Sequence, residues 1–157
     1  MKYNYLNIYN NLIKLTRNKN LYIKLEKQDI FSDRLIILFF HFAFFLKNFK
    51  SEMSKDYSQD LFDYVVKQLE FSIREIGYGD VSINKRMKEY VNLFYSIIDK
   101  IEQWEYSEET YKTKFIGNYL NIDKNLEFYV NYFEKYRIYL SKNTLNNFTK
   151  DIINLKF

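Results

Sequence analysis

The chain of 157 residues has the length of a single domain, and its residue usage excludes several kinds of chemistry. It has no cysteine, which excludes disulfides, thiolate nucleophiles and cysteine-ligated zinc and fits a reducing compartment. Its one histidine, His41, leaves no material for a histidine-rich metal site, so we expect no metal and no cofactor. The net charge of +4 comes mainly from residues 1–50. This surplus suits an anionic surface such as lipid or RNA, and a solvated basic face explains it equally well.

Residues 2–17 keep the helical spacing of apolar side chains at Leu6, Tyr9 and Ile13. A short helical or irregular piece is expected to follow over residues 18–28. The segment has no continuous apolar core, so we expect no signal peptide, although a transit peptide would share its amphipathic, acid-free character. We interpret it as the first helix of the domain.

The next predicted helix is the most apolar one in the chain, capped by Ser32 or Asp33 and running to about Lys47. Its centre, residues 35–46, is apolar on every side apart from His41. A membrane span needs about 20 such residues, so this run is too short, and Arg34 and Lys47 bracket it. We therefore predict a buried central helix, with a bilayer-touching segment as the alternative, and a core role for the histidine.

Residues 49–57 are polar and are predicted to form a loop. Ser58 is the expected N-cap of the following helix, which has Asp60 in its first turn and runs to Ile76. Gly77 then stands where a helix favours a left-handed residue after its end. The apolar stripe of this helix consists of Leu61, Val65, Leu69 and Ile73.

Ser82 is the expected cap of a long helix that reaches about Gln103, and residues 104–107 break it. Another helix starts near Glu108 and is interrupted or ended at Gly117; the last strong helix spans residues 123–140, before a weaker amphipathic tail. No stretch alternates as a strand would. The sequence predicts one all-α domain over residues 1–157, with six or seven helices packed around the apolar central helix.

The glycine pair at residues 77 and 79 excludes some functions. It does not predict a nucleotide-binding loop, because no third glycine and no preceding strand accompany it. Glu75 and Asp80 could lie close across the turn, but no nucleophile or orienting partner is near, so we expect no enzyme. Asp80 is expected to bind the backbone amides of the turn, and Arg74 to pair with Glu70.

The basic residues after the turn have a less complete structural explanation. Lys85, Arg86 and Lys88 are expected in the first turns of a helix, where each cation opposes the macrodipole by about 0.3–1 kcal/mol. Either the two acids of the turn neutralise them or they face an acidic partner. The candidate partner-binding residues are therefore Arg74, Glu75, Asp80, Lys85, Arg86 and Lys88, with Gly77 and Gly79 as the structural turn.

The stretch Arg74-Glu75-x-Gly77-x-Gly79-Asp80, continued by Val81-Ser82-Ile83 and Lys85-Arg86-Met87-Lys88, resembles the ubiquinol–cytochrome c chaperone family. Arg17 with Leu21-Tyr22, Asp33-Arg34 leading to His41, and Asn118-Tyr119 resemble further segments of that family. Two features depart from it: Asn84 stands where members often carry proline, and the C-terminal tail lacks an expected glycine.

The resemblance implies a non-enzymatic, all-α assembly chaperone of the cytochrome bc1 complex, of the shorter alphaproteobacterial type. Such proteins bind newly made cytochrome b, a hydrophobic membrane-protein client, and take no small-molecule substrate. The implied location is the cytoplasm, peripherally at the inner membrane, or the matrix side in a eukaryote. The ribosome and an anionic membrane surface are further implied contacts. The alternative hypothesis is a basic RNA- or ribosome-binding module.

Overall fold

The computed structural model describes residues 4–25 and 30–150 of the chain. Seven α-helices and three short 3-10 helices account for most of these residues, and no strand occurs among them, which confirms the predicted all-α class. The α-helices are α1 (Tyr5–Thr16), α2 (Phe31–Phe49), α3 (Lys55–Ile76), α4 (Asp80–Ile101), α5 (Glu109–Leu120), α6 (Leu126–Ser141) and α7 (Leu145–Phe148). The 3-10 helices are Lys19–Leu21, Lys50–Glu52 and Trp104–Tyr106.

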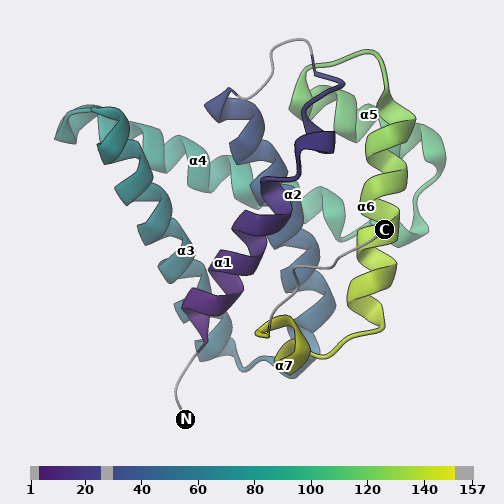
Figure 1. Ribbon diagram of the computed structural model, residues 1–157, viewed down its shortest axis with the longest axis horizontal. Helices are drawn as coiled ribbons and strands as arrows, with labels where there is room; N and C mark the ends of the chain where they lie inside the picture. Colours follow the sequence, from purple (N-terminus) through teal and green to yellow (C-terminus); the bar gives the residue numbers. More distant parts are fainter. Residues whose placement is uncertain (1–3, 26–29, 151–157) are drawn as a thin grey trace.

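Helix α2 lies at the centre, as predicted from its apolar sequence. Figure 1 shows α1 in front of it, α4 crossing behind it, and α5 and α6 along its other side. Every residue from Leu35 to Phe45 is buried, including His41. Because the helix is apolar all round, it is stable in water only when neighbours cover each of its faces. Within the described residues, no helix is both long and apolar enough to cross a membrane.

Many of the aromatic side chains of the protein pack on α2 and cover its surface. Phe42 stacks on Phe94 of α4 with ring centres 5.1 Å apart, and Phe44 stacks on Phe133 of α6 at 5.7 Å. Phe45 reaches Phe148 of α7 at 4.7 Å. Aromatic pairs contribute about 0.5–1.5 kcal/mol beyond the area that they bury. The rings of α2 therefore tie three different helices to one central element.

His41 is a core residue, as the sequence predicts. Its Nδ1 donates to the Ile37 carbonyl at 2.8 Å, so its Nε2 is the acceptor for the Tyr132 hydroxyl at 2.7 Å. The Tyr136 hydroxyl donates to the backbone carbonyl of the same histidine at 3.1 Å. Burial lowers the pKa of His41 from 6.5 to about 3, which keeps the ring neutral in the folded protein.

Buried hydrogen bonds fix the first segment against distant parts of the chain. The Asn11 amide donates to the carbonyls of Phe148 and Lys150 at 2.6 and 2.7 Å, which joins α1 to the end of α7. The Tyr129 hydroxyl of α6 donates to the Leu21 carbonyl at 2.6 Å. These bonds hold α1 and the segment after it in the domain, because a buried donor or acceptor left without a partner costs about 1–3 kcal/mol.

Two predicted helix starts are wrong. Helix α2 begins at Phe31 with Ile30 as N-cap, ahead of Ser32 and Asp33, and it continues to Phe49 instead of ending near residue 47. Its first residue packs on Tyr90, with ring centres 6.2 Å apart, so apolar contact decides this start. Residues 49–57 are likewise not a loop, because α3 begins at Lys55.

The N-cap of α3 is Ser54 in place of the predicted Ser58. The Ser54 hydroxyl accepts the backbone N–H of Tyr57 at 3.0 Å. Met53 and Tyr57 both pack against the core, and this burial stabilises the additional first turn of the helix.

Two further boundaries differ from the prediction. Helix α4 begins at Asp80 with Gly79 as N-cap, so Ser82 lies inside it. Helix α5 passes through Gly117 and ends at Leu120, followed by Asn121 in the left-handed conformation at φ +55°. A Cβ at position 117 would lie 2.9 Å from the Ile122 carbonyl oxygen. The glycine therefore allows the backbone after α5 to pass close to the helix. Part of the predicted C-terminal tail, Ile152 and Leu155, lies outside the described residues.

Residues 71–88 form the hairpin tip, which comprises the end of α3, a three-residue turn and the start of α4. In Figure 1 this tip projects at the left end of the longest axis of the molecule. Gly77 ends α3 with φ +106°, as predicted, and its N–H donates to the Arg74 carbonyl at 3.0 Å. Gly79 has an ordinary extended conformation with φ −75° and ψ 163°.

The two glycines of the turn are expected to respond to substitution with opposite signs. Gly77→Ala should lower the free energy of unfolding by about 1–2 kcal/mol, because its φ disfavours any Cβ. Gly79→Ser should raise it by a few tenths to about 1 kcal/mol, because serine can cap α4 and its Cβ meets open space. Urea unfolding of the two variants measures both values. Equal effects at the two positions would contradict this account of the turn.

The stability of the fold should depend on pH through His41. The unfolded ring binds a proton near pH 6.5 and the folded ring only near pH 3, so stability is complete above 6.5 and falls as the pH drops through this window. The limiting slope is about 1.4 kcal/mol per pH unit. In urea unfolding at several pH values, His41→Gln should show a shallower slope than the wild type. Asn11→Ala, the control, should be destabilised at every pH with the wild-type slope, and a wild-type slope in His41→Gln would refute this assignment.

Candidate functional site

The hairpin tip carries every residue that the sequence predicts as a partner contact. Arg74 Nη1 donates to Asp80 Oδ1 at 2.6 Å, which joins the last turn of α3 to the first residue of α4. This hydrogen bond raises the pKa of Arg74 above its ordinary value. The predicted pair with Glu70 is present at the longer distance of 4.0 Å. Asp80 therefore binds an arginine across the turn, and the predicted capping of backbone amides by this carboxylate is wrong.

Tyr78 lies between the two glycines and contacts the following helix. The Arg86 guanidinium carbon lies 3.9 Å from the centre of the Tyr78 ring, a distance that favours a cation–π interaction. Since Tyr78 is still 38% exposed, the contact holds the ring at the surface of the tip without burying it. Arg86 thus has a structural partner inside the tip.

Lys85 and Lys88 are exposed and point away from the buried face of α4, which is marked by Ile83. Neither lysine forms an ion pair with another residue in the described part of the chain, and Glu75 is exposed nearby without one. Because α4 begins at Asp80, the lysines lie in its second and third turns. The macrodipole acts mainly within the first turn, so the predicted electrostatic cost at these positions is smaller than expected.

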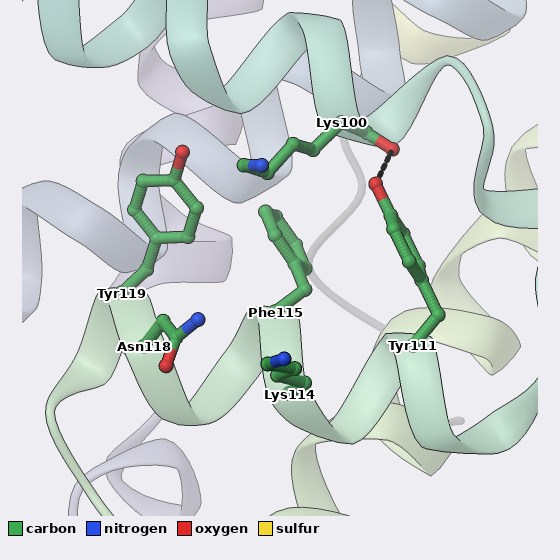
Figure 2. Close-up of a pocket in the computed structure, with 6 residues that line it drawn as sticks. All are labelled: Lys100, Tyr111, Lys114, Phe115, Asn118 and Tyr119. Carbon is green, nitrogen blue, oxygen red and sulfur yellow. Dashed lines mark hydrogen bonds between the residues drawn. The ribbon is translucent and has the colours of Figure 1, made fainter.

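A second candidate region surrounds Asn118 on α5. Three hollows of about 390, 960 and 610 Å³ meet there, and Asn118 lines all of them. In the smallest one, Lys100 of α4 and Lys114 of α5 lie on opposite sides of the Phe115 ring, and the lysine side chain from α4 extends toward Tyr119 (Figure 2). The floor of this groove is aromatic and its edge is basic.

The cations around this groove come from distant parts of the sequence. Lys24 and Lys124 line the largest hollow together with Lys114, and Asp123 is the acid among its lining residues. Within residues 4–25 and 30–150, Lys24, Lys100, Lys114 and Lys124 form no ion pair, although Lys24 lies over the Phe128 ring at 5.2 Å. Sequence reasoning missed this groove, and the Asn118-Tyr119 likeness to the chaperone family is the signal that could have found it.

The group of charged side chains around Glu134 has a structural role. Glu134 of α6 accepts the indole N–H of the buried Trp104 at 2.7 Å and binds Arg137. Burial alone would raise the pKa of Glu134, but these hydrogen bonds bring it below its ordinary value. Lys112 lies 3.6 Å from the same carboxylate and over the indole ring. The described residues contain no group of three or more His, Cys, Asp or Glu side chains placed to hold a metal ion.

A comparison with known protein families gives a match over the middle of the chain. The family model described as ubiquinol-cytochrome C chaperone matches residues 24–112, more than half of the chain. This range contains α2, α3, α4 and the whole hairpin tip. No curated protein and no solved structure matches the chain. The resemblance seen in the sequence is confirmed for the hairpin tip and for Asp33-Arg34 with His41, whereas Arg17, Leu21-Tyr22 and Asn118-Tyr119 lie outside the matched residues. The chain belongs to the ubiquinol–cytochrome c chaperone family.

Proposed function

We propose that this protein is an assembly chaperone of the cytochrome bc1 complex that binds newly made cytochrome b. The family match over residues 24–112 is the observation that carries the proposal. Membership supports a chaperone acting on a protein client of that complex and no enzymatic reaction. The described residues also offer no nucleophile beside a base, since the one histidine is buried and bound to Tyr132.

The hairpin tip is the contact surface that we propose for the partners of this chaperone. Its charged side chains are exposed except for the half-buried Arg86, and the hairpin that carries Lys85 and Lys88 projects at one end of the molecule (Figure 1). Arg74 and Asp80 have a different part in this proposal, because their hydrogen bond fixes the angle between α3 and α4. Variants of Lys85 and Lys88 therefore test the charge of the tip, and variants of Arg74 and Asp80 test its shape.

A strain without this gene should contain less cytochrome b and less assembled bc1 complex, measured by haem spectra and native gels. Lys85→Glu with Lys88→Glu should fail to restore the complex, because the exposed charge is reversed while the fold is kept. The control, Lys135→Glu with Lys142→Glu, makes the same change on exposed residues of the opposite part of the chain and should restore it. Normal bc1 content in the deletion strain would refute the proposed function.

The ion pair of the turn permits a separate test. Arg74→Asp should lower bc1 content, because two carboxylates would then repel each other across the turn. Exchange of both residues, Arg74→Asp with Asp80→Arg, should restore the complex if the pair sets the angle of the tip. If the exchanged variant fails while it unfolds at the wild-type urea concentration, the arginine itself is the contact.

A basic RNA- or ribosome-binding module is the second candidate function, and the groove around Asn118 favours it. The four lysines, which form no ion pair among the described residues, would suit phosphates, and counterion release would make the affinity fall steeply with salt. Lys100→Glu with Lys114→Glu should then weaken binding of a single-stranded RNA and reduce the salt slope by about two. The Lys135 and Lys142 variant is again the control. No RNA binding at low salt would eliminate this function.

A further inference from the structure

The hairpin tip exposes more apolar surface than any other stretch of similar length in the described chain. Nine large apolar or aromatic side chains are exposed among the described residues, and four of them lie within residues 71–81. They are Phe71, Ile76, Tyr78 and Val81. Val81 is 86% exposed, although it stands on a helix whose inner face is buried. Isolated exposed apolar residues are common, but a cluster of them marks an interaction site.

Basic side chains accompany this apolar cluster. Residues 71–88 carry four basic and two acidic side chains, and one of the acids, Asp80, is bound to Arg74. Lys85 and Lys88 are exposed without ion pairs in the described part of the chain. The tip thus presents apolar side chains next to two lysines that form no ion pair among the described residues.

The projecting shape of the tip favours a flat partner, such as the surface of a lipid bilayer. The apolar residues belong to a hairpin whose backbone projects at one end of the molecule (Figure 1), and none of them lines the hollows around α5 or the one in the core. A projecting apolar tip with exposed cations beside it can enter the surface of a bilayer without any groove on this chain. Cations beside the tip would then meet anionic headgroups, which attract basic side chains near the surface.

We propose that the hairpin tip inserts into an anionic lipid bilayer, with Ile76, Tyr78 and Val81 entering the headgroup–acyl boundary and Lys85 and Lys88 binding headgroups. This inference names the bilayer as the partner of the tip. It rests on the proposed function in one respect, namely that the client is a membrane protein. The turn has few residues that could rearrange, since Gly77 and the Arg74–Asp80 pair already fix it. The side chains at the end are therefore presented before contact, which lowers the ordering cost of binding.

The test is flotation of the purified protein with vesicles of phosphatidylcholine, with or without phosphatidylglycerol. We expect binding to the anionic vesicles alone and a loss of binding at high salt. Val81→Asp should weaken partitioning about tenfold, because an apolar contact is lost and a repelled charge is added. Val81→Trp should strengthen it, since tryptophan favours the membrane interface.

The matched control is Tyr106→Asp. Tyr106 is 89% exposed, against 86% for Val81, and it lies beyond the other end of α4, about 30 Å from the tip along the helix. The same charge at this position should leave vesicle binding unchanged. Equal loss in the two variants, equal binding to uncharged vesicles, or no binding to any vesicle would overturn the proposal.

The vesicle result is independent of the proposed function. If anionic vesicles bind the tip but the deletion strain assembles normal bc1 complex, the membrane contact stands and the chaperone assignment fails. If Val81→Asp lowers bc1 content while the wild type ignores vesicles, the tip is a protein contact, and the membrane proposal is overturned while the chaperone function stands.

Discussion

A helix that is apolar on every side must be covered on every side, and this requirement of α2 organises the rest of the molecule. Phe94 of α4, Phe133 of α6 and Phe148 of α7 each stack or pack on a phenylalanine of α2 from a different direction. His41 is the one polar side chain in the centre of the run, and it is accepted there because Ile37 and Tyr132 satisfy both ring nitrogens. The abundance of aromatic residues is in large part a property of this core.

Because the interior is packed around α2, the candidate contact surfaces lie on parts of the molecule that project from this core or surround it. The hairpin tip is one such part. It is built from two long helices, and the buried face of each helix stops short of the turn that joins them. The groove around Asn118 is the other, and its lysines come from the start, the middle and the later part of the chain. The two regions differ in character: one is convex with exposed apolar residues, and one is hollow with a basic edge.

The sequence predicted the features that depend on local pattern and failed where packing chooses between equivalent signals. The centre of α2, the core role of His41 and the left-handed Gly77 follow from periodicity and from the freedom of glycine. Ser54 and Ser58 are both acceptable caps, and burial of Met53 and Tyr57 selects the earlier one. The groove was missed because Lys24, Lys100 and Lys124 come to line adjoining hollows only through the tertiary fold, and the Asn118-Tyr119 pair was the one local signal of it. The partner-binding role of the tip stays a prediction.

The hydrogen bonds of Asn11 have a consequence for how the molecule is made. Its amide lies in α1, whereas both of its acceptors, the carbonyls of Phe148 and Lys150, lie 137 and 139 residues further along the chain and are synthesised later. Until then α1 carries a donor that has no buried partner, and the segment after it lacks the hydroxyl of Tyr129. Contacts of such wide sequence separation are slow to close. Helix α1 therefore gains these contacts only after α7 has emerged from the ribosome, and any surface that depends on α1 forms after that point.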